Sequence, residues 1–240
     1  MRILVVNDDG IRSPGLAALA GMAKRFGEVW VAAPENQCSG MSQKLTLFDE
    51  MTLRRADFPV EVAGAWSLGG TPADCVKVAL DVLLPCRPDY VFSGVNDGWN
   101  AGFDVVYSGT IGACQEAVMN GIPAIAFSAH GSADLQVAEH WMPAIAEELL
   151  ALGQAPGEIW NVNFPACAPE AVRGILRERF LAPLQLYSSV FSTRPHPDGY
   201  DRIRQKGVPI GPGLAPDGSD IAAVLDGYIS IGKIKSPVMA

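Results

Sequence analysis

Five short apolar runs alternate with helical patterns along most of the chain, and this alternation limits the possible fold more than any other feature. The runs are rich in Val, Ile, Ala and aromatic residues, as strands covered on both faces are. They lie at 3–6, 29–33, 90–92, 124–127 and 159–164, with helical patterns at 16–26, from 71 onward, at 110–120 and at 134–152. Strands that alternate with helices predict an α/β fold, in which a mostly parallel sheet has helices on both faces.

The clearest helix start is the sequence Thr71-Pro72-Ala73-Asp74. Thr71 is a favoured N-cap residue and Pro72 suits the first helical position. Asp74 stands three residues after the cap, where its carboxylate can accept a hydrogen bond from the backbone of the cap. Before this helix, residues 44–70 favour short β segments.

After the fifth run the strand and helix signals weaken over residues 185–213, where Pro, Gly and polar residues gather. We expect a protruding arm there, because such residues build loops rather than a packed core. Order returns at Ser219-Asp220, a helix cap, and at the short apolar strand 228–231. We therefore expect one domain, with a core at 1–184 and the arm and C-terminal segment at 185–240.

Composition excludes several classes of protein. The chain has 240 residues, of which 49% are hydrophobic and 18% charged, so a well-filled core is expected. A net charge of −8 argues against a nucleic-acid duplex as partner. The 5 cysteines are odd in number and widely spaced, which disfavours a disulfide framework or a zinc site. Without a signal peptide or an apolar run long enough for a bilayer, we expect a cytoplasmic protein that does not enter a membrane.

Two adjacent carboxylates, Asp8 and Asp9, directly follow the first apolar run. They would lie at the carboxyl edge of the sheet, where open α/β folds bind ligands. Adjacent carboxylates repel each other unless a positive partner is near, and a divalent cation is the simplest one. The alternative is an Asp-Asp-Gly turn that caps the next helix.

Two more oxygen donors follow other strands: Ser39 after the second run and Asn96 after the third. With Asp8 and Asp9 they form a hard-oxygen set that suits Mg²⁺, Mn²⁺ or Ca²⁺ rather than zinc or copper. Nearby, Ser108-Gly109-Thr110 opens a helix, and free amides with two hydroxyls at a helix N-terminus favour an anion. A cation beside an anion site is what phosphoryl hydrolysis requires.

These motifs, taken in order along the chain, resemble the SurE family of stationary-phase survival proteins, which are metal-dependent 5'/3'-nucleotidases. The residues that match are Asn7-Asp8-Asp9-Gly10, Ser39-Gly40, Gly70-Thr71-Pro72-Ala73-Asp74-Cys75, Ser93-Gly94-Val95-Asn96 with Gly98, Asn100, Gly102 and Asp104, and Tyr107-Ser108-Gly109-Thr110. The resemblance implies a Rossmann-like core, with a β-hairpin arm and a C-terminal segment that are exchanged between subunits. Asp97 and Trp99 depart from the family pattern.

The resemblance also implies roles for single residues. Asp8, Asp9, Ser39 and Asn96 would ligate one divalent metal per subunit, Mg²⁺ or Mn²⁺, with Ca²⁺ as a substitute in crystals. Ser108, Gly109 and Thr110 would hold the substrate phosphate, with Asn100 close by. Asp8, Asp9 and Asn96 are the predicted catalytic residues, and a homodimer or homotetramer is expected.

We therefore predict a phosphomonoesterase that acts on nucleoside monophosphates. Attack by water is favoured over a phospho-enzyme, because Asp8-Asp9 lacks the Asp-x-Asp spacing of aspartyl-phosphate enzymes. A nucleotide-sugar transferase would need a second Rossmann-like half, for which the chain has no room, whereas a non-catalytic nucleotide or metal sensor stays open. Glu116 and the Trp66, Trp141 and Trp160 side chains are expected to be structural, and Asp104 either orients the Asn-Gly loop or joins the site. His130 is the best placed of three scattered histidines, which also include His140 and His196.

Overall fold

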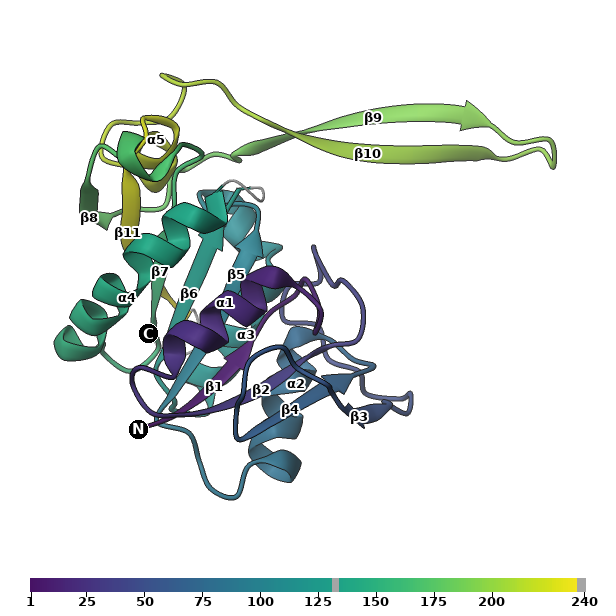
Figure 1. Ribbon diagram of the computed structural model, residues 1–240. Coiled ribbons are helices and arrows are strands. Elements are labelled where there is room, and N and C mark those ends of the chain that lie inside the picture. The colour runs from purple at the N-terminus through teal and green to yellow at the C-terminus, as the bar shows by residue number, and fades with distance from the viewer. Residues whose placement is uncertain (131–133, 237–240) are drawn as a thin grey trace.

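The computed structural model describes residues 1–130 and 134–236. Nine of its strands form one sheet in the order β3-β4-β2-β1-β5-β6-β7-β11-β8 (Figure 1). Their bounds are Arg2–Val6 (β1), Glu28–Pro34 (β2), Leu53–Arg55 (β3), Gly64–Leu68 (β4), Tyr90–Asp97 (β5), Ala124–Ala129 (β6), Glu158–Asn163 (β7), Ile175–Arg179 (β8) and Ile229–Lys235 (β11). The central strands pair in parallel, and β3 and β11 run antiparallel to β4 and β7. The predicted fold class is confirmed.

Helices cover both faces of this sheet (Figure 1). The longer ones are α1 (Pro14–Ala23), α2 (Pro72–Val78), α3 (Gly109–Met119) and α4 (Asp134–Leu152). Ile3 and Val5 of β1 pack in one core with α1 and α4, and Leu4 and Val6 pack in the other with α2 and α3. Because strand side chains alternate between faces, a strand buried on both faces needs the unbroken apolar run that the sequence shows.

Shorter elements complete the chain, and two predicted boundaries differ from the structure. The short helices are η1 (Ala79–Leu83), η2 (Phe103–Val106), η3 (Pro169–Ala171) and α5 (Asp220–Leu225). Helix α1 ends at Ala23 rather than Phe26. Strand β5 continues to Asp97, because Asn96 and Asp97 still pair with β6 after an irregularity. Among the described residues, no helix is long and apolar enough to cross a membrane.

The C-terminal strand β11 pairs with β7 and β8 of its own chain. Because β11 lies between two partners of its own chain, it is not an exposed edge of the sheet. Exchange of the C-terminal segment between subunits, which the resemblance implies, stays a prediction.

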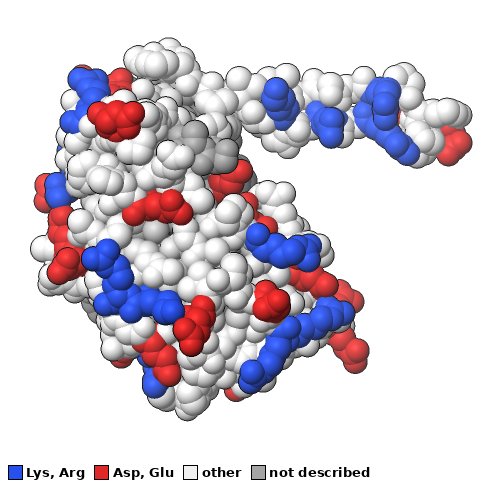
Figure 2. All heavy atoms as spheres, viewed as in Figure 1, with Lys and Arg blue, Asp and Glu red and all other residues white. Residues whose placement is uncertain are grey.

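The expected arm is a two-stranded antiparallel hairpin of β9 (Tyr187–Pro195) and β10 (Asp201–Pro209), which projects away from the body (Figure 1). Arg194 pairs with Arg202, and Arg204 and Lys206 follow at alternate positions on β10. Directly opposed and alternate residues share a face. One face of the arm is therefore basic, and Figure 2 shows Lys and Arg gathered along it.

A separate apolar cluster fixes the root of the arm to the body. It joins Trp99 and Ala101, which follow β5, to Ala182 and Leu186, which precede the arm, and to Ile221 of α5. The Asp220 carboxylate accepts hydrogen bonds from the backbone nitrogens of Gly102 and Ala182, at 2.8 and 2.9 Å. The loop after β5 and the segment before the arm therefore form one packed unit.

Candidate active site

A tight turn at the end of β1 presents the two adjacent carboxylates. The Asn7 side chain bonds both to the carbonyl oxygen and to the backbone nitrogen of Gly10, at 3.1 and 3.2 Å. Gly10 has a φ of +96°, and a Cβ there would lie 3.3 Å from the Pro34 carbonyl oxygen. Helix α1 begins later and has Ser13 at its N-cap. Asp8 and Asp9 thus lie in a turn, but they do not cap the helix.

Asp8 is buried, with 2% of its surface exposed. Its Oδ1 accepts a hydrogen bond of 2.6 Å from the Thr110 hydroxyl, at the start of α3. Burial raises the pKa of Asp8 to about 6, against the lowering effect of the Thr110 hydrogen bond and with a further increase from Asp9. A Cβ on Gly109 would lie 2.8 Å from the Asp8 Cβ, so only glycine fits at that position of α3.

Asp9 faces a cleft at the sheet edge. Its Oδ2 accepts a hydrogen bond of 2.9 Å from the Asp97 backbone nitrogen, and Gln37 approaches Oδ1 at 3.4 Å. Burial is also the main reason that the pKa of Asp9 is raised. Within the part of the chain that the structure describes, no Lys or Arg forms an ion pair with Asp8 or Asp9.

The cleft beside Asp9 has a volume of about 230 Å³ and lies between the starts of α1 and α4 and the ends of β5 and β6. Its lining residues are Asp9, Ser13, Pro14, Gly15, Val95, Asn96, Asp97, Ala129 and Leu135. Asn96 is half-buried there, and its amide nitrogen donates a hydrogen bond of 2.7 Å to the Gly98 carbonyl oxygen. That bond leaves the amide oxygen of Asn96 available to a ligand.

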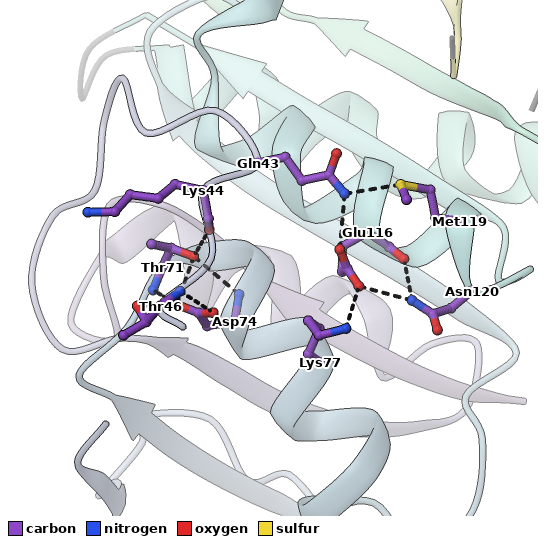
Figure 3. A network of polar contacts seen from close by, with 9 residues as sticks. All are labelled: Gln43, Lys44, Thr46, Thr71, Asp74, Lys77, Glu116, Met119 and Asn120. Carbon is purple, nitrogen blue, oxygen red and sulfur yellow. Dashed lines mark hydrogen bonds and ion pairs between the residues drawn. The ribbon is translucent and has the colours of Figure 1, made fainter. Parts of the chain in front are cut away.

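Ser39 lies in an exposed turn after β2. Its neighbour Cys38 reaches the site, because the Cys38 backbone nitrogen donates a hydrogen bond of 2.7 Å to the Asp8 carbonyl oxygen. Further along, the loop is held by α2 and α3 (Figure 3): Thr71 donates to the Lys44 carbonyl oxygen at 2.5 Å. The segment that carries Ser39 is thereby held at Cys38, on its N-terminal side, and at Lys44, on its C-terminal side.

Glu116 is the buried acceptor of the second network in Figure 3. It accepts hydrogen bonds from Gln43 at 3.0 Å and Asn120 at 3.1 Å, and it pairs with Lys77 at 3.4 Å. These contacts tie the 43–46 loop to α2 and α3. The prediction that Glu116 is structural is confirmed.

The start of α3 lies against Asp8, as the sequence pattern suggested. Ser108 is the N-cap residue, and its hydroxyl accepts a hydrogen bond of 3.1 Å from the Ile111 backbone nitrogen. Ser108 and Thr110 are buried, and both hydroxyls are already hydrogen-bonded within the protein. A ligand at this helix end would therefore meet backbone amides and the helix dipole before it meets hydroxyl groups.

Comparison with known proteins decides the family. The family model described as survival protein SurE matches residues 3–182. The 5'-nucleotidase SurE of Heliobacterium modesticaldum is 36% identical over 98% of this chain and 86% of its own length. That of Brucella canis is 39% identical over 96% of this chain and 91% of its own. This chain belongs to the SurE family. The SurE protein of Aquifex aeolicus, in its crystal structure, is 34% identical, with a TM-score of 0.81 over 98% of this chain and 93% of that one.

Three of the four residues that the SurE resemblance assigns to a metal, Asp8, Asp9 and Asn96, fit such a group. Asp8 and Asp9 are two carboxylates without a cationic partner among the described residues, and one of them is almost wholly buried. The amide oxygen of Asn96 is left to accept from a ligand, because its nitrogen is bound to the Gly98 carbonyl oxygen. Carboxylate and amide oxygens are the donors that hard divalent cations prefer. No cluster of three or more His, Cys, Asp or Glu competes for a metal in the described ranges.

Asn100, the fourth residue expected to lie near the phosphate in a SurE site, is buried in a network of its own. Its amide nitrogen donates a hydrogen bond of 2.8 Å to the Ser128 hydroxyl. The backbone carbonyl oxygen of Asn100 accepts hydrogen bonds from the side chains of Asn161 and Asn163, at 2.9 and 3.0 Å. These contacts connect the loop after β5 to β6 and β7, and its role in phosphate binding stays a prediction.

Three aromatic side chains beside this SurE-type loop received no firm role from the sequence. Trp99 is buried, stacks on His130 with ring centroids 4.8 Å apart, and donates from Nε1 to the Phe164 carbonyl oxygen at 2.6 Å. It is packing rather than an open surface for a base. Tyr187, at the root of the arm, accepts a hydrogen bond of 3.2 Å from the Trp99 backbone nitrogen. Tyr187 lies in the segment where the sequence pattern fails, so no local signal pointed to it.

Asp104 has a clear structural role. Its Oδ2 accepts hydrogen bonds of 2.9 Å from the backbone nitrogens of Leu186 and Tyr187. Asp104 therefore anchors the segment that leads into the arm, a role that the sequence did not predict. Trp66 also packs as predicted, stacked on Trp30 with centroids 5.6 Å apart.

Proposed function

We propose that this chain is a metal-dependent phosphomonoesterase that hydrolyses nucleoside monophosphates to a nucleoside and phosphate. The observation on which this depends is the pair Asp8 and Asp9, adjacent, without a cationic partner among the described residues, and beside the N-terminus of α3. The relatives named 5'-nucleotidase SurE, which align over nearly the whole chain, support the same activity.

Asp8, Asp9, Ser39 and Asn96 would hold one Mg²⁺ or Mn²⁺. A divalent cation bound there supplies charge neutralisation and lowers the pKa of a coordinated water molecule. A bound cation would also offset the repulsion between the two adjacent carboxylates. The raised pKa values of Asp8 and Asp9 fit this account, because Asp8 is buried, Asp9 is half-buried, and neither has a positive partner among the described residues.

The substrate phosphate would lie at the N-terminus of α3. There the Gly109 backbone amide and the helix dipole favour negative charge, while the Thr110 backbone amide already bonds to the Asp8 carboxylate. Thr110 would contribute mainly through Asp8, since its hydroxyl donates to the Asp8 carboxylate. The apolar wall of the cleft beside Asp9 leaves room for the rest of the substrate.

Attack by a water molecule fits the burial of the site better than a phospho-enzyme. Asp8 is almost wholly buried and one of its oxygens is occupied by Thr110, which makes it a poor nucleophile. Asp9 lines the cleft and is the more accessible carboxylate. We therefore assign Asp9 to orient the attacking water and accept its proton.

A phosphatase assay tests this proposal. The protein is first treated with a chelator and then supplied with a chromogenic phosphomonoester, with and without Mn²⁺. We expect hydrolysis only when Mn²⁺ is restored, and no hydrolysis by Asp9→Asn, whereas the remote exposed variant Asp217→Asn behaves as the parent protein. Nucleotide and metal binding without any hydrolysis would instead favour a non-catalytic sensor.

We also propose a homo-oligomer in the cytoplasm. The hairpin arm supports assembly, because Phe191 and Ile203 are 62% and 68% exposed on it and a lone two-stranded hairpin is only marginally stable in water. No disulfide bond joins any of the five cysteines, all of which lie in the described ranges, and this suits a reducing compartment.

A further inference from the structure

One peptide group links the root of the arm to a predicted metal ligand. The Gly98 carbonyl oxygen accepts a hydrogen bond of 2.7 Å from the Asn96 amide nitrogen. The nitrogen of the same peptide group, which belongs to Trp99, donates a hydrogen bond of 3.2 Å to the Tyr187 hydroxyl oxygen. Because a peptide group is planar and rigid, a partner that fixes its nitrogen also fixes its oxygen.

The Tyr187 hydroxyl is itself held in place from several directions. The backbone nitrogens of Tyr187 and Leu186 both donate to the Asp104 carboxylate, and the Leu186 side chain is buried in the cluster with Trp99. The hydroxyl also lies 3.4 Å from Nδ1 of His130, whose ring stacks on Trp99. Tyr187 is therefore anchored by the body of the protein as well as by its pairing with Pro209 in the arm.

Gly98 lets the three groups meet. Its φ is +137°, a backbone conformation that residues with a side chain rarely adopt. A Cβ at Gly98 would lie 3.6 Å from Nδ2 of Asn96 and 3.8 Å from the hydroxyl of Tyr187. A side chain at this position would therefore lie against both the Asn96 amide and the Tyr187 hydroxyl.

We propose that Tyr187 is a positioning residue, which acts through the Gly98–Trp99 peptide group to hold the Asn96 amide with its oxygen toward the metal. This rests on the proposed function, since it takes Asn96 as a ligand. A carbonyl oxygen accepts only from the nitrogen end of an asparagine amide, so the bond to Gly98 selects one of the two amide orientations.

The hydrogen-bond chain also strengthens the ligand. A peptide group whose N–H donates to Tyr187 has a more polarised carbonyl oxygen, which accepts more strongly from Asn96. The Asn96 amide oxygen then becomes the better donor to a cation. Groups behind a metal ligand commonly matter for affinity in this way, because they fix its orientation and basicity.

The test is the metal affinity of Tyr187→Phe, which removes the hydroxyl and keeps the ring. We expect its dissociation constant for Mn²⁺, measured by calorimetry, to rise about three- to tenfold, somewhat less than when a direct partner of a ligand is removed. Tyr200→Phe, near the turn of the arm, is the matched control and should bind Mn²⁺ as the parent protein does. An unchanged dissociation constant for Tyr187→Phe would overturn the proposal.

A second pair of variants separates positioning from a general loosening of the fold. Asn96→Asp keeps oxygen donors but cannot donate to Gly98, so the Tyr187 hydroxyl has nothing left to position. In that background Tyr187→Phe should leave Mn²⁺ affinity unchanged, and the same three- to tenfold loss there would contradict the proposal. If the parent protein binds no Mn²⁺ at all, the proposed function fails first, which is a different result from a tyrosine variant that binds normally.

Discussion

At the scale of one residue, the buried Asp8 carboxylate lowers the stability of the metal-free protein at the proposed metal site. Asp8 has hydrogen bonds from the Thr110 hydroxyl and from backbone amides, but no cationic partner among the described residues, and burial still raises its pKa. Such a buried carboxylate is costly, because the ion has lost water without a full replacement. The Asp8 side chain has little room to move toward α3, since a Cβ on Gly109 would lie 2.8 Å from the Asp8 Cβ. A bound cation would offset the buried negative charge of Asp8, and this would explain why the residue is an ionisable one.

Asp8→Asn is therefore expected to stabilise the metal-free protein while it weakens the site. The amide oxygen can still accept from Thr110, and the buried charge is gone. We expect the free energy of unfolding in a chelating buffer to increase by roughly 1–3 kcal/mol. Urea unfolding measures this, and Mn²⁺ should stabilise the parent protein but not the variant. A variant less stable than the parent without metal would argue against an uncompensated Asp8.

Gly109→Ala is expected to damage the site, because an added Cβ would lie 2.8 Å from the Asp8 Cβ. Alanine suits a helix better than glycine by up to about 1 kcal/mol, but the new Cβ would push against the Asp8 side chain. Phosphatase activity should fall at least about tenfold, which corresponds to about 1.4 kcal/mol. Gly21→Ala in α1, where an added Cβ meets nothing within 4 Å, is the control and should keep full activity. Equal activity in both variants would contradict the claim that a side chain at position 109 displaces Asp8.

At the scale of elements, local sequence signals predicted most of the structure, and distant contacts explain what they missed. The Thr71 cap is an example of success: the Asp74 backbone nitrogen donates to Thr71, and the Thr71 nitrogen donates back to the Asp74 carboxylate, at 3.2 and 2.9 Å. All the information for that motif lies within four residues. The Tyr187 contact with Trp99 spans 88 positions and depends on the packing of the arm root, so no short pattern reveals it.

The predicted site shows the same division. The turn that holds Asp8 and Asp9, and the helix start at Ser108, follow from local patterns and lie together because strand ends meet at one sheet edge. That the Thr110 hydroxyl turns to Asp8, and that Asn100 is enclosed by Ser128 and two asparagines of β7, depends on tertiary packing. Residue type and order therefore predicted that these turns lie together at one sheet edge, but not the partner of each side chain.

Asp74→Ala should be among the more destabilising single changes outside the two cores. Asp74 caps α2 and also accepts hydrogen bonds from the backbone and hydroxyl of Thr46, at 3.0 and 2.7 Å. Loss of the cap and of these contacts is expected to lower the free energy of unfolding by about 2–4 kcal/mol. Thr46→Ala, which removes only the hydroxyl, should cost less than half as much in the same urea titration. Equal losses would mean that the cap contributes nothing.

At the scale of the whole molecule, an acidic body has an arm with one basic face. The net charge of −8 of the whole chain disfavours a nucleic-acid partner. One side of the hairpin is nevertheless basic, with Arg194, Arg202, Arg204 and Lys206. Charges of opposite sign on separate parts of one chain favour association between copies. The apolar Phe191 and Ile203 lie on the other face, by the same alternation.

We predict that the arm is needed for assembly. Light scattering at micromolar concentration should give the mass of a dimer or larger species for the full chain. A variant in which residues 189–207 are replaced by a two-residue Asn-Gly turn should be monomeric, with an unchanged circular dichroism melting temperature for the body. It keeps Tyr187, so Mn²⁺ binding should persist. A monomeric parent protein would remove the arm as an assembly device.

The most direct test of the central claim is the release of phosphate from adenosine 5'-monophosphate. Chelator-treated protein, the same protein with Mn²⁺ restored, and Asp9→Asn with Mn²⁺ are compared under otherwise identical conditions. We predict phosphate release by the Mn²⁺-restored parent protein alone. Equal release by the chelated protein, or by Asp9→Asn, would contradict a metal-dependent reaction at the end of β1.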